Sequence, residues 1–477
     1  MKKILFASSE VHPLIKTGGL ADVAGSLPRA LAELSQDIRI ILPNYQSLNT
    51  IEEVRFISTV RVNNQDANIL ETKLPNSEVI VWLVDCPALF DVPGNPYVDE
   101  SGHSWPNLAD RFTLFCRIIV EVAMNRAHLD WSADVVHCND WQTGLVPALL
   151  SIEGNTPSTV CTIHNMAYQG MFPKNVFTEQ NLPVELWHPH GVEFHDMLSF
   201  IKGGLSYSSR ITTVSPTYAK EIQTSEFGYG LEGLLSHKYD ILSGIINGMD
   251  LNQWNPKTDT SISEPYSFDH LEKKMINKTS LQARSSLPVN KSVPLFGLIS
   301  RLVDQKGIDL IIECLQEMVN MPLQFVLLGS GDKSVEQKLH DFARLYPKKI
   351  SVTIGYNEGL AHQIEAGVDI FLMPSRFEPC GLNQMYSQRY GTIPIVRETG
   401  GLADTIEDAL PKSLANNTAT GILFKQASSG ALLEAIKRAM LLFNDKKTWK
   451  KIQVNAMKKD FSWKKSAKQY LALYEEI

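Results

Sequence analysis

The sequence predicts an α/β protein with two doubly wound, Rossmann-like domains facing a deep cleft. Short apolar runs bounded by Gly, Pro, Asn or Asp alternate with longer amphipathic stretches. Buried parallel strands need crossover helices, so this alternation indicates a parallel sheet covered by helices. The alternation occurs in two separate sets, and a chain of 477 residues suits two or three domains of roughly 150 residues each.

The first set of strand-like runs begins at the N-terminus. Helical patterns lie between the runs; Ala24, Leu27, Leu31 and Leu34, for example, recur at spacings that place them on one helical face. The strands expected in this set are residues 4–7, 37–43, 79–85, 135–138, 159–164 and 210–215.

The second set begins near Val293, with helical patterns at residues 310–321 and 430–442. A polar stretch, residues 252–269, separates the sets, and we place the hinge at residues 244–247. We therefore expect domains at residues 1–244 and 245–456, with ligands outside the carboxyl ends of the strands. The strands expected in the second set are residues 295–299, 324–329, 351–355, 369–374 and 393–396.

Composition narrows the class of protein. Hydrophobic residues make up 44% and charged residues 20% of the chain, as in a globular protein. The net charge is −7 and no dense basic tract occurs, so we expect no nucleic-acid partner. Six scattered cysteines without a CxxC pair or zinc-type spacing predict reduced thiols and a cytoplasmic protein. No apolar run approaches the roughly 20 residues of a membrane helix, so we expect no membrane partner.

Two loops of the first set carry candidate binding residues. Lys16-Thr17-Gly18-Gly19 follows the first strand and opens a helix, where free amides and a lysine favour a phosphate; an ordinary flexible loop is the alternative. Asp140 and His164 end two further strands. His164 would bond a sugar hydroxyl or be a structural histidine, and Asp140 would bind a ligand or be a helix N-cap.

The second set has two more such loops. Arg301 and Lys306 follow its first strand, and cations there would grip a diphosphate, with plain surface charge as the alternative. Glu378 lies on the loop of residues 374–382, where a carboxylate would act on a sugar or only complement a helix dipole. The Gly400-Gly401 loop resembles the first Gly-Gly loop and alone is weak evidence.

Gly329-Ser330-Gly331 begins like a dinucleotide fingerprint, but Ser334 stands at the third glycine position.

Together these motifs resemble those of the bacterial and plant glycogen and starch synthases. Seven occur in that family's order along nearly the whole chain: residues 16–20, 137–141, 162–165, 247–250, 301–307, 375–381 and 399–404. The resemblance implies the GT-B fold, in which the final helix, within residues 457–477, crosses back to the first domain. A helical apolar stripe fits that helix: Trp463, Ala467, Tyr470, Leu471 and Tyr474.

The resemblance also implies an activity. It is the retaining transfer of glucose from ADP-glucose to the non-reducing 4-hydroxyl end of an α-1,4-glucan such as glycogen. ADP is released, and no metal ion or cofactor is expected.

Residue roles follow from the same resemblance. Glu378, Arg301, Lys306 and His164 are expected in catalysis, with Arg301 and Lys306 on the diphosphate. Tyr356 matches an aromatic residue that stacks on adenine; a buried core tyrosine is the alternative. Lys16, Gly18 and Gly19 should contact the donor phosphates or glucose. The glucosyl site should be lined by Cys380, Gly381 and Leu382. The residues expected by the glucose or the glucan are His164, Asp140 and Asn247.

The mechanism and some competing functions stay open at this stage. Attack from the leaving-group face in one step and a double displacement through an enzyme carboxylate both give retention. Three other functions compete: a retaining transferase for UDP-sugars, an NAD-dependent oxidoreductase and a catalytically silent glucan-binding protein. The incomplete dinucleotide fingerprint argues against the oxidoreductase.

Overall fold

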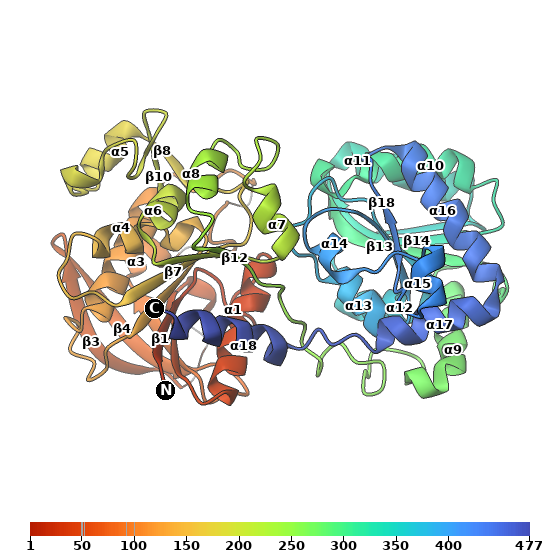
Figure 1. The fold of residues 1–477 in the computed structure, drawn as a ribbon, viewed down its shortest axis with the longest axis horizontal. Coiled ribbons are helices and arrows are strands. Elements are labelled where there is room, and N and C mark those ends of the chain that lie inside the picture. The colour runs from red at the N-terminus through yellow and green to blue at the C-terminus, as the bar shows by residue number, and fades with distance from the viewer. Residues whose placement is uncertain (49–50, 52, 92, 100) are drawn as a thin grey trace. The chain divides into compact units, whose positions relative to one another are not determined.

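The chain forms two compact units in the computed structural model, which describes residues 1–48, 51, 53–91, 93–99 and 101–477 (Figure 1). Unit 1 comprises Met1–Gly248 and Trp463–Ile477, and unit 2 comprises Met249–Ser462. The sequence-based boundaries were residues 244 and 456. None of the helices described is long and apolar enough to span a bilayer.

Unit 1 is built on a nine-stranded sheet with the order β12-β11-β7-β6-β1-β2-β5-β4-β3. The seven strands from β12 to β5 pair in parallel, and β4 and β3 add antiparallel pairs at one edge. Its strands are β1 (Lys3–Ala7), β2 (Asp37–Pro43), β3 (Arg55–Val62), β4 (Gln65–Lys73), β5 (Ile80–Asp85), β6 (Val135–Asn139), β7 (Ser158–Ile163), β11 (Arg210–Thr213) and β12 (Leu242–Gly244).

The sequence did not predict the β3–β4 hairpin, nor a small antiparallel sheet of three strands. That sheet consists of β8 (Met171–Pro173), β9 (Glu193–Phe194) and β10 (Met197–Ser199). The helices of unit 1 are α1 (Gly19–Glu33), α2 (Pro87–Phe90), α3 (Leu108–Ala123), α4 (Leu145–Leu150), α5 (Lys174–Glu179), α6 (Phe200–Tyr207), α7 (Pro216–Glu221), α8 (Glu232–His237) and α18 (Trp463–Glu475).

Helix α18 belongs to unit 1 although it follows unit 2 in the sequence. It packs against α1, and its Tyr474 hydroxyl lies 2.6 Å from Nδ1 of His137 in β6. The prediction that Leu471 belongs to the buried apolar stripe of α18 is wrong. Leu471 is half-buried, because the helical spacing places Leu473 on the buried face instead. The predicted face of α1 is likewise shorter, since Leu34 is already its C-cap.

Unit 2 is built on a six-stranded parallel sheet with the order β15-β14-β13-β16-β17-β18. The chain winds outward from β13 in one direction and then restarts at β16 in the other. The carboxyl ends of β13 and β16 therefore flank the switch point where ligands bind in such sheets. Its strands are β13 (Leu295–Leu302), β14 (Gln324–Gly331), β15 (Ile350–Ile354), β16 (Ile370–Met373), β17 (Ile393–Arg397) and β18 (Ile422–Phe424).

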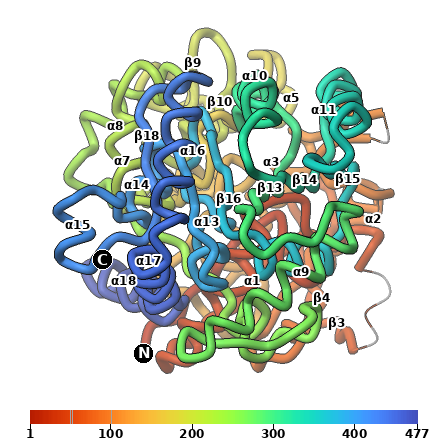
Figure 2. The backbone as a smooth tube through the Cα atoms, turned by 90° about the vertical axis from the view of Figure 1, so that its right-hand side faces the viewer, coloured from red at the N-terminus to blue at the C-terminus, as the bar shows by residue number. Residues whose placement is uncertain are grey.

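Helices cover both faces of this sheet, as the alternating sequence pattern predicts. One apolar core includes residues of α10 and α16, which pack together, and a second includes residues of α9 and α12. Figure 2 shows the course of α9, α10 and α16 in the backbone trace. The helices of unit 2 are α9 (Lys274–Arg284), α10 (Ile308–Met318), α11 (Lys333–Leu345), α12 (Glu358–Gly367), α13 (Asn383–Arg389), α14 (Gly400–Thr405), α15 (Pro411–Ala415), α16 (Ser429–Asn444) and α17 (Lys446–Met457). The predicted α/β class, with two units each built on a largely parallel sheet, is confirmed.

The polar stretch at residues 252–269 lies within unit 2 and is packed against its helices. Trp254 stacks between His362 of α12 and Tyr386 of α13, with ring centroids 3.9 Å apart on each side. Asp259 accepts hydrogen bonds from the Tyr390 hydroxyl at 2.5 Å and pairs with His362 at 2.7 Å. Asp259 of this stretch is therefore satisfied by side chains from distant parts of the same unit.

Candidate active site

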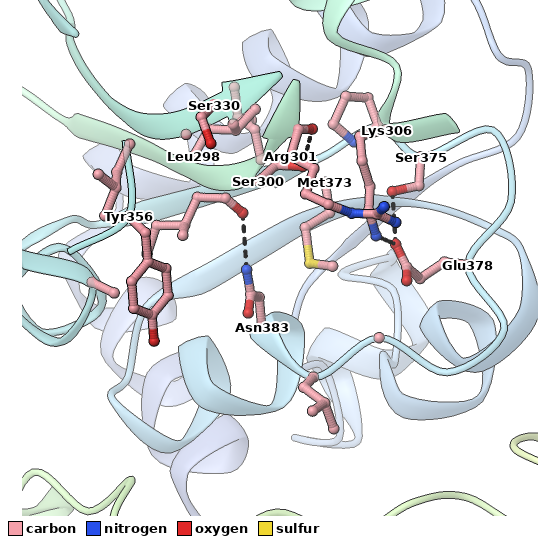
Figure 3. Close-up of a pocket in the computed structure, with 18 of the residues that line it drawn as sticks. Leu298, Ser300, Arg301, Lys306, Ser330, Tyr356, Met373, Ser375, Glu378 and Asn383 are labelled. Atoms are coloured by element: carbon pink, nitrogen blue, oxygen red, sulfur yellow. Dashed lines mark hydrogen bonds and ion pairs between the residues drawn. The ribbon is translucent and has the colours of Figure 1, made fainter. Parts of the chain in front are cut away.

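A pocket of about 320 Å³ lies in unit 2 at the switch point of its sheet (Figure 3). The carboxyl ends of four parallel strands and the start of α13 form its walls. Because each of these strands ends at the same edge, residues far apart in sequence converge there. The lining segments are residues 298–301, 328–330, 355–357, 372–375 and 381–383, together with Lys306, Ala361 and Glu378.

Glu378 and Lys306 form an ion pair at one end of this pocket. Nζ of Lys306 lies 2.5 Å from Oε2 of Glu378, and Oγ of Ser375 donates to the same oxygen at 3.0 Å (Figure 3). Glu378 is only 6% exposed, so the ionised carboxylate depends on these partners for compensation of its lost hydration. The structure thus brings together two residues that the sequence places 72 positions apart.

Arg301 lines the same pocket, on the side where Lys306 and Glu378 lie (Figure 3). The expectation that Arg301 and Lys306 both lie in a loop is wrong in detail. Strand β13 continues to Leu302, and Lys306 ends a short 3₁₀ turn, Asp304–Lys306. Arg301 is held at the end of a strand and is exposed, so its guanidinium is available to an anion.

Tyr356 lines the pocket away from Glu378 (Figure 3). It is 83% exposed, which excludes the alternative of a buried core tyrosine. Asn357 caps α12 by accepting from the amide of Leu360 at 2.8 Å, and Asn383 is fixed by a 2.9 Å bond to the carbonyl of Ile299. An open aromatic face and fixed amide groups suit a flat heterocycle.

Gly381 and Leu382 line the pocket, but Cys380 does not. Cys380 is buried, with 5% of its surface exposed. Gly381 has φ +72, in the left-handed region that favours glycine.

In unit 1, the Lys16–Gly19 loop surrounds a carboxylate that the sequence interpretation missed. Glu10 accepts from the amides of Thr17 at 2.5 Å and Gly18 at 3.1 Å, and from the Tyr97 hydroxyl at 2.7 Å. Lys16 is exposed and pairs with Asp22 at 2.7 Å. A Cβ added to Gly18 or Gly19 would meet nothing within 4 Å, so packing does not require glycine there and a ligand has room to approach.

Asp140 and His164 lie together at the ends of β6 and β7. Oδ1 of Asp140 accepts from the amide of His164 at 2.7 Å, and Nε2 of His164 lies 2.9 Å from Oδ1 of Asn139. Asp140 precedes a 3₁₀ turn, but its side chain does not cap it, so the N-cap alternative is wrong. The φ of Asp140 is +55, a conformation uncommon for a non-glycine residue.

Burial shifts both groups toward neutrality. It raises the pKa of Asp140 to about 7, against the opposing amide bonds, and lowers the pKa of His164 to about 3. A neutral imidazole beside a carboxyl that titrates near neutrality suits hydrogen bonding to sugar hydroxyls.

Asn247 lies elsewhere in unit 1, after β12. It is buried, and its Oδ1 has no hydrogen-bond partner among the residues described. The following residue, Gly248, packs so closely on Trp463 of α18 that a Cβ would lie 2.6 Å from its backbone. No hydrogen bond described joins Asn247 to the other candidates.

Sequence reasoning missed several polar residues that contact these groups: Glu10, Asn139, Ser375, Asn383, and Arg397, whose guanidinium donates to the carbonyls of Ser375 and Arg376. Asn139 and Ser375 lie inside two of the motifs described above, one residue before Asp140 and three residues before Glu378. Glu10 carried a usable signal as an acid just after the first strand. Arg397 carried none, because its partners are main-chain carbonyls.

Comparisons with known proteins define the class first. Residues 3–237 match the family model described as the starch synthase catalytic domain, and residues 280–458 match glycosyl transferases group 1. The catalytic domain of starch synthase IV from Arabidopsis thaliana, solved with ADP and acarbose, superposes with a TM-score of 0.89 at 30% identity, covering 100% of this chain and 99% of that one. The chain therefore has the fold of a glycosyltransferase of the starch synthase type.

Curated relatives give the particular family. Glycogen synthase 1 of Methylococcus capsulatus is 52% identical over 99% of this chain and 96% of that protein. Glycogen synthase of Cellvibrio japonicus is 50% identical over 100% of both chains. The chain belongs to the bacterial glycogen synthase family. A sucrose-phosphate synthase from Thermosynechococcus elongatus, at 16% identity and a TM-score of 0.58 with 100% and 99% coverage, shares the fold alone.

Proposed function

We propose that this chain transfers glucose from ADP-glucose to the non-reducing 4-hydroxyl end of an α-1,4-glucan, with retention and release of ADP. The observation that carries the proposal is the pocket in which Arg301, Lys306 and Glu378 converge, in a member of the glycogen synthase family. The ADP in the related starch synthase structure supports the choice of donor. We further propose a cytoplasmic location on the basis of family membership.

In this proposal Arg301 and Lys306 hold the diphosphate of the donor. Negative charge builds on the leaving oxygens as the glycosidic bond breaks, and fixed cations stabilise that charge. Lys306 already lies 2.5 Å from Glu378. An ammonium group has three donors, so Lys306 can keep this contact and still bond a phosphate oxygen.

Glu378 lies by the glucosyl group, and Tyr356 stacks on the adenine at the open end of the pocket. Gly381 and Leu382 present their main chain to the sugar and phosphate, and Cys380 supports that turn from behind. The span from the ion pair to the exposed Tyr356 face gives room for the two ends of a sugar nucleotide.

From unit 1, we assign Lys16, Gly18 and Gly19 to the donor. The empty space over both glycines and the exposed Lys16 ammonium support this choice. His164, Asp140 and Asn247 are assigned to the glucose or the glucan acceptor. The neutral His164 and the buried, unpaired Oδ1 of Asn247 suit hydrogen bonds to uncharged hydroxyls.

We favour a one-step transfer over a double displacement. The Glu378 oxygen Oε2 already accepts from both Lys306 and Ser375, which weakens it as a nucleophile and suits it to charge stabilisation. The acceptor oxygen then bonds to the anomeric carbon as the carbon–oxygen bond to phosphate breaks. The hydroxyl proton passes to the departing phosphate, so atoms and charge balance.

A donor assay tests the proposal. Purified protein is incubated with glycogen and either ADP-glucose or UDP-glucose, and incorporated glucose is released with an α-1,4-specific glucosidase. Faster incorporation from ADP-glucose is the expected result. Incorporation from UDP-glucose alone would overturn the donor, and no incorporation by a folded sample that binds ADP would overturn the acceptor or the activity.

An Arg301→Ala/Lys306→Ala double variant tests the diphosphate assignment. Charge-assisted hydrogen bonds contribute about 1.5–3 kcal/mol each, so ADP affinity measured by calorimetry should fall at least about 100-fold. A Lys338→Ala/Arg344→Ala variant on α11, outside the pocket, is the matched control and should bind ADP normally. Unchanged ADP affinity in the first variant would remove the assignment.

A further inference from the structure

The second Gly-Gly loop, between β17 and α14, plays no part in the function proposed above. The loop of residues 375–380, which carries Glu378, has no regular structure of its own. Its shape must therefore come from neighbouring elements. Displacing a catalytic group by about 1 Å can cost on the order of 100-fold in rate, so whatever holds this loop affects turnover.

Arg397, the last residue of β17, reaches the main chain of that loop. Its Nε donates to the carbonyl of Ser375 at 2.8 Å, and its Nη2 donates to the carbonyl of Arg376. Its Nη1 lies 3.4 Å from the carbonyl of Lys425, beyond the end of β18. One planar guanidinium thus joins two successive carbonyls of the Glu378 loop to the far edge of the sheet.

Gly400 and Gly401 support the same loop from its other end. The amide of Gly401 donates to the carbonyls of Glu378 and Pro379, both at 3.1 Å. A Cβ on Gly400 would lie 2.1 Å from the Glu378 carbonyl oxygen, and one on Gly401 would lie 2.2 Å from that of Cys380. The two backbones are therefore in direct contact, and only glycine permits the approach.

The Glu378 side chain depends on the main chain held in this way. Ser375, whose carbonyl accepts from Arg397, also donates its hydroxyl to Oε2 of Glu378. Arg397 and Glu378 do not share a hydrogen bond among those described, so the arginine acts through the main chain and Ser375.

We propose that Arg397, with Gly400 and Gly401 behind it, is a positioning residue that sets where the Glu378 carboxylate lies for glucosyl transfer. The inference rests on the proposed function of Glu378. An arginine suits the task because its rigid fork reaches two successive carbonyls at once, which an ammonium group does not. Donor binding through Arg301, Lys306 and Tyr356 does not require it.

The test compares Arg397→Gln and Arg397→Lys with the intact enzyme. We expect kcat for glucose transfer to fall about 10- to 100-fold in Arg397→Gln, while ADP affinity changes less than about threefold. Arg397→Lys should recover part of the loss, because it keeps a cation that can bond one carbonyl. Arg397→Lys also provides a second test of the inference if Arg397→Gln does not fold.

Arg117 offers a matched control, because its Nη2 donates to the successive carbonyls of Gln180 and Asn181 within unit 1, and none of these residues lines the pocket. Arg117→Gln removes the same kind of contact and should leave kcat within about twofold. An equal kcat loss in Arg117→Gln would show a general structural effect and overturn the inference.

A double-mutant cycle separates positioning from mere support of the fold. If Arg397 acts through Glu378, adding Arg397→Gln to Glu378→Gln should lower kcat no further. Independent, multiplying losses would overturn the inference and leave Glu378 in place. Near-normal turnover in Glu378→Gln alone would instead overturn the proposed function of Glu378.

Discussion

The hexapeptide Thr-Gly-Gly-Leu-Ala-Asp occurs twice, at residues 17–22 in unit 1 and 399–404 in unit 2. Both copies follow a parallel strand and open a helix, α1 and α14. Their surroundings differ. The space around Gly18 and Gly19 is empty, whereas Gly400 and Gly401 press against carbonyls of the Glu378 loop. The same six residues thus leave room for a ligand in one unit and contact the main chain of the Glu378 loop in the other.

The difference shows that the partner across the loop, and not the motif, decides what the glycines do. In unit 1 the segment beside the loop contributes a carboxylate, Glu10, that binds its first amides. In unit 2 the amide of Gly401, the counterpart of Gly19, binds the main-chain carbonyls of Glu378 and Pro379. The open space at Gly18 and Gly19 leaves room for a ligand, whereas the close contacts of Gly400 and Gly401 fix the packing of two main-chain segments.

Gly400→Ala should have the largest effect. The new Cβ would overlap the Glu378 carbonyl at 2.1 Å, and φ +43 at Gly400 also disfavours alanine. We expect kcat to fall at least about 100-fold and the free energy of unfolding to drop by about 2 kcal/mol. Steady-state glucose transfer and denaturant unfolding measure the two changes. A normal kcat would mean that the Glu378 loop tolerates a shift, which would contradict the structural role given to Gly400.

Gly19→Ala should separate binding from stability. A Cβ at Gly19 has room, and alanine is favoured over glycine within a helix, so stability should stay equal or rise by up to about 1 kcal/mol. If the donor approaches Gly19 closely, the KM for ADP-glucose should increase about tenfold. An unchanged KM in a stable variant would assign the open space at Gly19 to no ligand.

A smaller effect concerns pH. Burial lowers the pKa of His137 to about 3, below its value of about 6.5 in an unfolded chain. Between these values the unfolded state binds the extra proton, so stability is present above pH 6.5 and is lost as the pH falls. Asp140, with its pKa raised to about 7, acts in the opposite direction between about pH 4 and 7.

The variant His137→Gln tests the histidine contribution. It should reduce the loss of stability between pH 6.5 and 5.5 by about 1 kcal/mol, as measured by hydrogen exchange in β6 and β7. An unchanged pH dependence would show that His137 is protonated in the folded state. Phe6, which packs beside His137 in the same core with ring centroids 4.8 Å apart, gives the control: Phe6→Leu lowers stability without altering its pH dependence.

Asp22→Asn should have the smallest effect. The Lys16–Asp22 pair has side-chain exposures of 43% and 25%, and exposed pairs contribute little. We expect the free energy of unfolding to change by less than about 0.5 kcal/mol and the KM for ADP-glucose by less than about threefold. Lys16→Met, which removes the ammonium group itself, should raise KM about tenfold. Equal effects of the two variants would mean that donor binding depends on the Lys16–Asp22 ion pair and not on the Lys16 ammonium group alone.

The sequence predicted the parallel sheets and most of their strands, because buried strands appear as short apolar runs. It did not predict β3 and β4, where exposed and buried residues alternate irregularly. It also gave no sign that Asp259, within residues 252–269, is satisfied by distant partners, His362 of α12 and Tyr390 just after α13. Long-range hydrogen bonding of this kind leaves no local pattern.

Candidate site residues at strand ends could be found in the same way. Arg301 lies at the end of β13, Lys306 follows that strand, and Glu378 follows β16, which pairs with β13. The sequence could not supply the residues that orient them, such as Ser375 and Arg397. Their partners include a single carboxylate oxygen and three carbonyls, and any polar residue at those positions would look equally ordinary in the sequence.

The position of α18 has a consequence for synthesis of the chain. Residues 463–475 complete unit 1 by packing on α1 and bonding to β6, yet all of unit 2 precedes them in the sequence. During translation, unit 2 is therefore synthesised, and can form its own core, before α18 is available to pack on unit 1. Until α18 is synthesised, the apolar surface of α1 and the imidazole of His137 stay exposed. We therefore expect chaperones to bind the exposed apolar surface of unit 1, most of which is translated first.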